Sequence, residues 1–189
     1  MENLNFSTIH LVEVLVGKKV GNNEAMKELK ARLFVDSPIG RIAIGSSEVG
    51  VLSIELSVTH PKTEFSDSSL AFSHAKKAAD QLDSYFSGSR STFDVPLDIE
   101  GTDFQRSVWR QISTIPFGEK LTYGEIAKRI RRPLAARAVG GAVGANPIPI
   151  LIGCHRVLGS NNLITGYSGG EGLSTKRWLL LHEAIGFQD

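Results

Sequence analysis

The chain has 189 residues, of which 41% are hydrophobic and 22% charged, a composition typical of a globular protein with its own core. Its single cysteine excludes an internal disulfide and favours a reducing compartment. The apolar run near the N-terminus is a poor secretory signal, because Glu13 interrupts it and no basic segment precedes it, and no apolar stretch is long enough to span a bilayer. The net charge of +1 divides unevenly, because residues 1–101 carry a net charge of −4 and residues 102–189 carry +5.

The first half of the chain predicts strands followed by a helix. Residues 1–28 are expected to form an N-terminal arm of unknown role. Apolar runs on either side of the turn signal at residues 37–40, and a third after Gly50, predict an antiparallel meander. Apolar residues at helical spacing then predict a helix over residues 69–88 with Gly88 as its stop. We therefore expect an α/β domain over residues 29–95 and a linker over residues 96–101.

The second half, residues 102–189, predicts a mainly helical domain. Capping-box patterns at Thr102 and Thr122 begin two helices, and Pro133 is suited to the first position of a third. The second and third are short and close together, which indicates a helix-turn-helix. A last helix is expected between Ser174 as its cap and Gly186 as its stop.

Basic residues gather at the expected helix-turn-helix, with no acidic residue between the first and last of them: Lys128, Arg129, Arg131, Arg132 and Arg137. Such a cluster is typical of a polyanion site, and a solvated helix face is the alternative. The third helix, "PLAARAVGGAVGAN", offers Arg137 alone to read base edges. It therefore predicts contact with the DNA backbone or minor groove, unless its small residues pack inside a core.

The single thiol lies in the stretch "NPIPILIGCHRVLGS". A lone cysteine is commonly a small buried hydrophobe. Here His155 follows Cys154 directly and can draw off its proton, while Gly153 leaves room for a substrate. The run "IPILI" predicts a buried strand, on which neighbours point to opposite faces, so His155 would act through a water or a local kink. Glu183 is a candidate to orient the imidazole, the alternative being a surface pair with His182.

Other kinds of site find little support in the sequence. One cysteine and five scattered histidines give no metal-ligand spacing, so we expect no metal and no cofactor. The stretch "GGAVGAN" lacks the spacing and the lysine of a phosphate loop. The glycine-rich stretch at residues 166–174 predicts a loop beside the thiol or a plain surface loop.

Six stretches in order resemble one family: "GTDFQRSVW", "IPFGEKLTYGEIAKRI", "AARAVGGAVGANPIPILI", "CHRVLGS", "TGYSGG" and "KRWLLLHE". Together they are similar to the O6-alkylguanine-DNA alkyltransferases, the methylated-DNA–protein-cysteine methyltransferases. The resemblance covers nearly all of residues 101–186 and is looser before that. It implies an α/β (α+β) N-terminal domain of ribonuclease-H-like shape and a mainly α C-terminal winged helix-turn-helix domain.

The resemblance also implies a suicide reaction on duplex DNA. O6-alkylguanine, and O4-alkylthymine with it, would be flipped out of the duplex and would lose its alkyl group irreversibly to Cys154. The protein would be a monomer, cytoplasmic or, in a eukaryote, nuclear. The implied thiol relay consists of His155 and Glu183, and Tyr123 would protonate the guanine.

The remaining implied roles concern DNA and the extruded base. Arg137 would fill the vacated stack, Asn146 would be a hinge, and Ser168, with Tyr167 beside it, would contact O6. The backbones of Cys154 and Val157 would face the exocyclic amine. The residues expected to bind DNA or the extruded base are therefore Arg131, Arg132, Arg137, Asn146, Val157, Tyr167 and Ser168.

Two departures from the family pattern bear on the site. Gly153 stands where the family usually has proline, and the segment "GGEGLSTKRW" is two residues longer than in many relatives. Three other functions remain as alternatives: a non-catalytic winged-helix protein that binds alkylated bases, a winged-helix regulator, and a thiol hydrolase.

Overall fold

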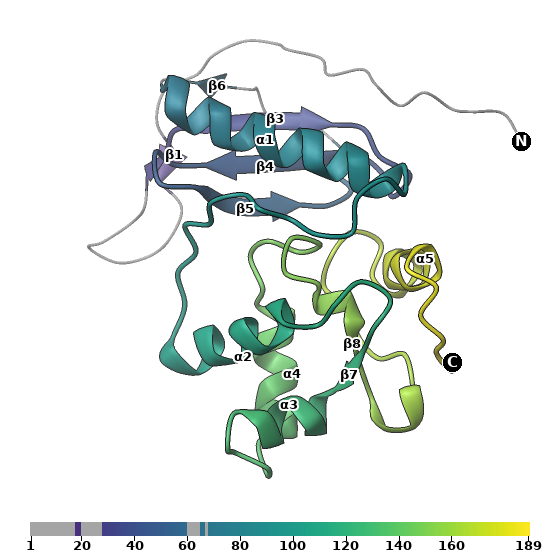
Figure 1. Cartoon of the computed structure of the whole chain (residues 1–189). Helices are drawn as coiled ribbons and strands as arrows, with labels where there is room; N and C mark the ends of the chain where they lie inside the picture. The colour runs from purple at the N-terminus through teal and green to yellow at the C-terminus, as the bar shows by residue number, and fades with distance from the viewer. Residues whose placement is uncertain (1–17, 20–27, 60–64, 67) are drawn as a thin grey trace, which may run out of the picture. The chain divides into compact units, whose positions relative to one another are not determined.

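The computed structural model describes residues 18–19, 28–59, 65–66 and 68–189 (Figure 1). The chain divides into two compact units, Met1–Ile99 and Glu100–Asp189. The expected N-terminal arm lies almost wholly outside the described residues. Of that arm, β1 (Lys18–Lys19) is described, and it pairs antiparallel with β2 (Glu28–Leu29).

The first unit contains a four-stranded antiparallel sheet in the order β5-β4-β3-β6. Its strands are β3 (Ala31–Val35), β4 (Ile42–Ser46), β5 (Val51–Glu55) and β6 (Phe65–Ser66). The predicted meander is confirmed, since β4 pairs with both β3 and β5. Gly40 closes the first turn at φ 93°, and its N–H bonds to the carbonyl of Ser37. Glycine suits this position because a positive φ costs it little.

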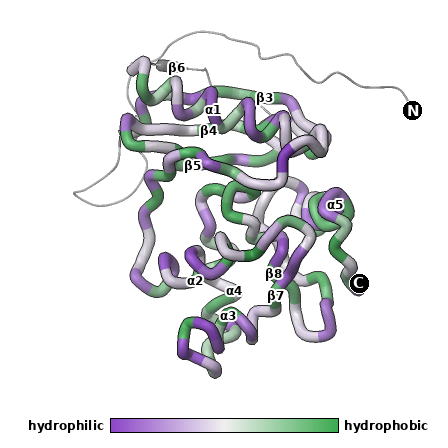
Figure 2. Tube along the Cα trace, in the orientation of Figure 1, coloured by the Kyte–Doolittle hydropathy of each residue, from purple (hydrophilic) through white to green (hydrophobic). Residues whose placement is uncertain are grey.

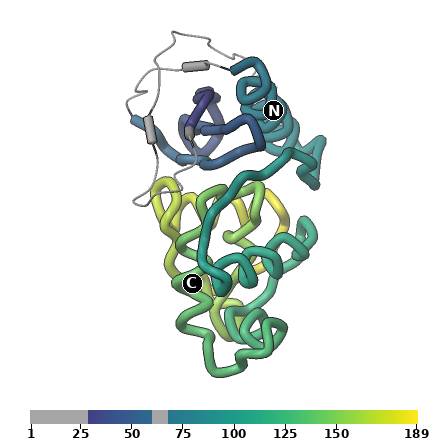
Figure 3. Tube along the Cα trace, turned by 90° about the vertical axis from the view of Figure 1, so that its left-hand side faces the viewer, coloured from purple at the N-terminus to yellow at the C-terminus, as the bar shows by residue number. Residues whose placement is uncertain are grey.

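One helix, α1 (Ser69–Phe86), lies along this sheet as a second layer (Figures 1 and 3). Hydrophilic and hydrophobic residues alternate along it in bands (Figure 2), and the hydrophobic ones include Ala75, Ala79 and Leu82, which are buried. Tyr85 is fully buried, whereas Phe86 next to it is partly exposed. Gly88 at φ 76° ends the helix as predicted, with its N–H on the Tyr85 carbonyl.

Part of the segment expected as a linker is bonded to the first unit. Leu97 forms a parallel bridge with Val51, and the N–H of Asp98 bonds to the Val51 carbonyl. The Ser47 hydroxyl also donates to the buried carboxylate of Asp98 at 2.5 Å. The chain leaves this unit after Ile99, where the two compact units divide.

In the second unit, α2 (Asp103–Ser113), α3 (Tyr123–Arg129) and α4 (Ala136–Gly144) pack against one another. The capping boxes predicted at Thr102 and Thr122 are both formed. The prediction that Pro133 opens the third helix is wrong, because α4 begins three residues later. Residues 132–135 instead form a turn closed by the Ala135 N–H on the Arg132 carbonyl, and Pro133 takes its second position, where the fixed φ of proline fits.

The predicted strand "IPILI" is also wrong. Pro149 and Ile152 form an isolated bridge with each other, and Ile150 between them has φ 75°. Ile148, Ile150 and Ile152 are buried, which explains the apolar run, but a proline and a left-handed residue prevent a continuous ladder. Burial rather than strand pairing accounts for the pattern.

The last helix differs from its prediction at both ends. The helix α5 (Leu173–His182) has Gly172 as its N-cap, so Ser174 lies inside it. Its C-cap is Glu183, followed by Ala184 at φ 55°, so the helix stops before the expected Gly186. Shorter elements complete this unit: β7 (Leu121–Thr122), η1 (Cys154–Arg156), β8 (Val157–Leu158), parallel to β7, and η2 (Ser160–Asn162). Along the described part of the chain, no helix combines the length and apolar character that crossing a membrane requires.

Candidate active site

Cys154 is held by two successive tight turns. Gly153 has φ −68° and ψ 60°, the geometry of an inverse γ-turn, and the Cys154 N–H bonds to the Ile152 carbonyl at 2.7 Å. Cys154 then opens the short 3-10 helix η1 with His155 and Arg156. The local kink, expected along with a bridging water as a way for His155 to act on the thiol, is therefore present. It places the thiol and the imidazole on one turn of helix.

The thiol is buried, with 4% of the residue exposed. Burial raises the pKa of Cys154, because a thiolate loses its hydration there. Hydrogen bonds with the side chains of Asn146 and Tyr167, and the charge of Lys176, act in the opposite direction. The protein thus keeps the resting thiol protonated and surrounds it with groups that stabilise the thiolate.

His155 is fully buried and is oriented by Glu183. Its Nε2 lies 2.8 Å from Oε1 of that carboxylate, while its Nδ1 is buried without a hydrogen-bond partner among the described residues. Burial lowers the pKa of His155, against the hydrogen bond and charge of Glu183, so the imidazole is neutral at rest. Because a carboxylate only accepts, the proton sits on Nε2 and the lone pair on Nδ1.

Glu183 is buried as well, with 1% of the residue exposed, and is not a surface partner of His182. Arg156 clasps it through Nε at 2.8 Å and Nη2 at 3.0 Å, while Nη1 donates to the Ile115 carbonyl at 2.7 Å. Burial alone would raise the pKa of Glu183, but the hydrogen bonds from His155 and Arg156 lower it to about 2. Glu183 is therefore a permanent anion that accepts hydrogen bonds from the neutral imidazole and from the cationic guanidinium.

Gly153 makes room for this arginine. A Cβ at Gly153 would lie 2.9 Å from Cδ and Nε of Arg156, a contact too close to be tolerated without movement. The guanidinium cannot move freely, since Glu183 and the Ile115 carbonyl fix it. In this chain, glycine before the cysteine lets Arg156 lie across the backbone of the turn.

Lys176, on α5, is a buried cation that the sequence analysis did not single out. Its Nζ donates to the Val157 carbonyl at 2.7 Å and to the Thr165 carbonyl at 3.3 Å. Burial lowers the pKa of Lys176 to about 8, against the opposing influence of Cys154. The sequence does carry a signal: Lys176 precedes Leu179, Leu180 and Glu183 by three, four and seven residues, which places it on the buried face of the helix.

Two residues tie the neighbourhood of the thiol to the end of α4. Asn146 donates from Nδ2 to the Ile152 carbonyl at 2.9 Å and accepts from the Ile148 N–H at 3.2 Å. The hydroxyl of Ser168 donates to the carbonyl of Gly144, the last residue of α4, at 2.9 Å. The loop that carries Tyr167 and Ser168 is therefore anchored beside the segment that leads to Cys154.

Tyr123 is the first residue of α3 and is partly buried. Its ring faces α4 at Gly140, where an added Cβ would lie 3.8 Å from Cδ1 and Cε1. Its phenolic oxygen accepts a hydrogen bond from Oγ1 of Thr165 at 3.1 Å. Tyr123 was expected at the site from the sequence, whereas no sequence signal pointed to Thr165.

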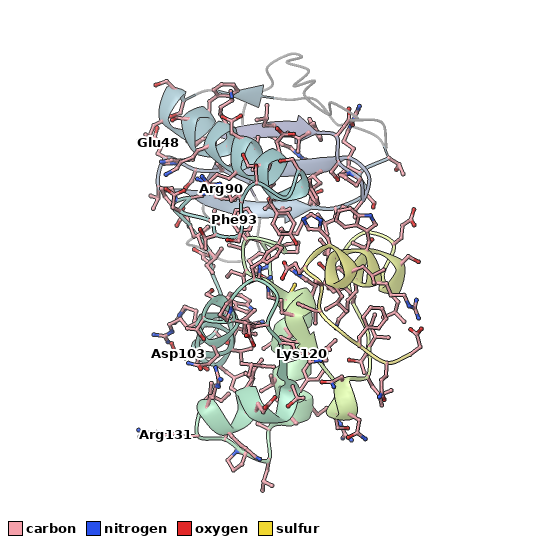
Figure 4. All side chains as sticks on the ribbon, turned by 45° about the vertical axis from the view of Figure 1, so that its right-hand side comes forward. Glu48, Arg90, Phe93, Asp103, Lys120 and Arg131 are labelled. Atoms are coloured by element: carbon pink, nitrogen blue, oxygen red, sulfur yellow. The ribbon has the colours of Figure 1, made fainter. Side chains whose placement is uncertain are left out.

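The arginines of the helix-turn-helix lie at its exposed surface. Arg131, at φ 58°, projects outward from the turn between α3 and α4 (Figure 4). Arg132 lies over the ring of Phe104, 5.8 Å from its centroid, and Arg137 is exposed near the start of α4. Leu134, within the same turn, is fully exposed. This cationic surface is solvated and suited to phosphates.

The described residues contain no group of three or more His, Cys, Asp or Glu side chains arranged to hold a metal ion. The buried ionisable groups around the thiol are Cys154, His155, Arg156, Lys176 and Glu183. Sequence reasoning found the thiol, the imidazole and the carboxylate. It missed the buried arginine and lysine, because their long side chains are usually solvated.

Two family models match nearly the whole of the described chain. Residues 30–99 match the ribonuclease-like domain of 6-O-methylguanine DNA methyltransferase, and residues 103–185 match its DNA-binding domain. The methylated-DNA–protein-cysteine methyltransferase of Mycobacterium tuberculosis is 46% identical over 149 residues, 77% of this chain and 87% of the relative. That of Methanosarcina acetivorans is 45% identical over 146 residues, 77% of this chain and 92% of the relative.

Solved structures agree with these matches. The M. tuberculosis protein in complex with DNA is 45% identical and superposes with a TM-score of 0.69 over 79% of this chain and 90% of that one. A second structure, M. tuberculosis O6-methylguanine methyltransferase, gives a TM-score of 0.70 at 42% identity, over 85% and 96% of the two chains. The two-domain architecture expected from the sequence is thereby confirmed. The chain belongs to the 6-O-methylguanine DNA methyltransferase family.

Proposed function

We propose that this chain repairs duplex DNA by moving the alkyl group of O6-alkylguanine, and of O4-alkylthymine, onto Cys154, once per molecule. The observation that carries the proposal is the buried thiol on the same helical turn as a neutral histidine, whose Nε2 is engaged by Glu183 and whose Nδ1 is unpaired. Family membership supports the reaction, and this geometry supports the assignment of its chemical groups.

The first step is removal of the thiol proton. His155 holds its own proton on Nε2 against Glu183, so the lone pair of Nδ1 is available to accept one through a water molecule. As the imidazolium forms, the anionic Glu183 stabilises it. The thiolate that remains is stabilised by its hydrogen bonds with Asn146 and Tyr167 and by the charge of Lys176.

The second step is displacement at the alkyl carbon. The S–C bond forms as the C–O6 bond breaks, and the electron pair of that bond moves into the guanine ring. Tyr123 donates its phenolic proton to N3, so guanine leaves as a neutral base. Ser168 and Tyr167 contact O6, and the backbones of Cys154 and Val157 receive the exocyclic amine; the Val157 carbonyl keeps one lone pair beside its bond to Lys176.

DNA binding makes the base accessible. A base stacked in a duplex cannot reach a buried thiol, so it must be extruded, at a cost of a few kcal/mol. Arg131 and Arg132 contact phosphates, Arg137 fills the vacated stack, and Asn146 is the hinge between α4 and the segment before the thiol. The small residues of α4 allow the close approach that a minor groove requires.

The reaction needs no cofactor or metal, and a monomer in the cytoplasm, or in a nucleus, carries it out. Within the proposed site no group serves to hydrolyse a thioether, so the alkylated protein is the end product. A regulator or a non-catalytic binder has no use for a thiol with this relay, and a thiol hydrolase would turn over.

The proposal is tested by intact-mass measurement after mixing with DNA that contains O6-methylguanine. We expect one added methyl group per chain, mapped to Cys154, and none in Cys154→Ala, which should still bind DNA. Turnover, or a methyl group on another residue, would contradict the proposal.

The roles of Arg137 and Tyr123 are separated by two substrates. Arg137→Ala should slow repair of duplex DNA far more than reaction with free O6-benzylguanine, which needs no extrusion. Tyr123→Phe should slow both reactions by ~10²–10⁴-fold, the usual worth of general acid catalysis. Equal effects of Arg137→Ala on both substrates would refute its assignment.

A further inference from the structure

We propose that Thr165 is a positioning residue for the proton donor Tyr123, and that it supports catalysis by donating a hydrogen bond to the phenolic oxygen. The proposal rests on the proposed function, because it assigns Thr165 a role in the same proton transfer. It is carried by one contact, from Oγ1 of Thr165 to the hydroxyl oxygen of Tyr123 at 3.1 Å, and by what fixes its two ends.

Thr165 is fixed through both its backbone and its methyl group. Its carbonyl accepts from the buried Nζ of Lys176 at 3.3 Å. Its Cγ2 lies against Gly159, where an added Cβ would come within 3.1 Å of it. Threonine has few χ1 choices, so a methyl group fixed in this way also fixes the direction of the hydroxyl.

Tyr123 is fixed from the other side. Thr122, directly before it, caps α3 through a complete capping box, and the ring faces Gly140 of α4. The two hydroxyls therefore meet between the helix-turn-helix and the loop that follows β8. Because Lys176 also bonds to the Val157 carbonyl, it holds the backbone beside Cys154 in register with the loop that carries Thr165.

The direction of the hydrogen bond determines what Tyr123 can do. When Thr165 donates, the phenolic oxygen is the acceptor and the phenolic O–H is directed to another partner, here N3 of the guanine. Once that proton has moved to N3, the phenolate oxygen keeps the hydrogen bond from Thr165, which is then charge-assisted and stronger. The phenolate later regains a proton from solvent, while the imidazolium of His155 releases to solvent the proton that it took from the thiol. Thr165 thus contributes most after the proton has begun to leave.

The test is a double-mutant cycle on Thr165 and Tyr123, read out as the rate of Cys154 alkylation by free O6-benzylguanine and by O6-methylguanine DNA. Thr165→Val keeps the branched shape and removes the hydroxyl, and should slow both reactions by about ten- to hundredfold, the usual value of a hydrogen bond to a charged group. In a Tyr123→Phe background the same substitution should change the rates by less than about twofold, because the acceptor is gone.

Three controls define the result. Thr165→Ser restores the hydroxyl and should return the rate to within about threefold of wild type. Thr114→Val removes a hydroxyl from the exposed end of α2 and should have no effect. DNA affinity and thermal unfolding of Thr165→Val should match wild type, and Thr165→Ala gives a second measurement if Thr165→Val unfolds.

The outcomes separate the inference from the function on which it rests. If wild type does not alkylate Cys154, the proposed function fails. If wild type reacts and Tyr123→Phe is slow, but Thr165→Val is unaffected or adds its full effect to Tyr123→Phe, the function stands and the role of Thr165 is overturned. Failure of Thr165→Ser to recover the rate would also overturn it.

Discussion

An arginine–glutamate pair occurs in each unit of the chain, and both pairs have an N–O distance of 2.8 Å. Arg32 and Glu55 pair across the sheet of the first unit, with 18% and 54% of their side chains exposed. Arg156 and Glu183 pair beside the thiol, with 8% and 0% exposed. Water competes for the first pair and not for the second. Breaking the second pair therefore costs more stability, although the two N–O distances are equal.

The same contrast extends to the other buried polar groups. In the described part of the first unit they are Ser46, Ser47, Gln81 and Asp98. Ser46 donates to a backbone carbonyl, Ser47 donates to Asp98, and Gln81 bonds to Asp94. The second unit buries His155, Arg156, Lys176 and Glu183 around Cys154. Buried charges must be fully paired to be tolerated, so the stability of the second unit is tied to the charged groups around Cys154.

The largest effect that we expect comes from breaking the buried pair. Glu183→Gln leaves Arg156 buried without its anion and should lower the free energy of unfolding of the second unit by about 3–5 kcal/mol. Glu55→Gln, the matched change in the exposed pair, should cost no more than about 1 kcal/mol.

Urea unfolding measures both changes. The two tryptophans, Trp109 and Trp178, lie in the second unit, so their fluorescence follows that unit alone, while circular dichroism also follows the first. Similar losses for the two variants would remove the contrast between the pairs.

The loss of stability at acid pH tests the buried pair in a second way. The pKa of Glu183 is lowered from 4.5 to about 2 in the folded protein, so its contribution is complete above pH 4.5 and is lost as the pH falls toward 2. Tryptophan-monitored stability of wild type should therefore fall over this window more steeply than that of Glu183→Gln. Parallel curves would show that the buried carboxylate has no special role in acid sensitivity.

Replacing Lys176 should have a smaller effect on stability, and its pH dependence should appear at alkaline pH. Lys176→Met keeps much of the volume but leaves two carbonyls without a donor, at a cost of about 1–3 kcal/mol at neutral pH. Between pH 8 and 10.5 the unfolded chain binds more protons at this lysine than the folded one, so wild-type stability gains with pH there. The variant should lack this gain, measured as the difference between the two pH profiles.

The smallest effect on stability is expected from a change of backbone conformation at Ala184, next to Glu183. Ala184 occupies the left-handed position after α5, with its N–H on the Leu181 carbonyl and the Ile185 N–H on the Leu180 carbonyl. Glycine is favoured there, so Ala184→Gly should stabilise the second unit by up to about 1 kcal/mol. Ala138→Gly, an exposed change inside α4, should destabilise it by a similar amount.

Local signals predicted much of the fold. Capping boxes at Thr102 and Thr122, the turn at Gly40 and the stop at Gly88 all depend on neighbouring residues, and the structure contains each of them. The start of α4 and the run "IPILI" were mispredicted, because proline favours both a helix start and a turn and because burial in a turn produces the same apolar pattern as a strand.

The site was predictable in part for a related reason. The residue types Cys154, His155 and Glu183 indicate nucleophilic chemistry wherever they lie, and the fold brings them together. The remaining contacts depend on tertiary structure and leave no local signal in the sequence. Arg156 and Lys176 donate to backbone carbonyls, and Thr165 donates to a tyrosine hydroxyl. The roles assigned to the DNA-contacting residues stay predictions.

The segment after α5 has a practical consequence for handling the protein. The Ile164 N–H donates to the Gln188 carbonyl at 2.7 Å, and the Gln188 N–H donates to the Asn162 carbonyl at 2.9 Å. Residues that follow the last helix thereby brace the loop immediately before Thr165. Truncation at Gly186, or an affinity tag that pulls on Gln188, would loosen that loop, so purification handles are better placed elsewhere on the molecule.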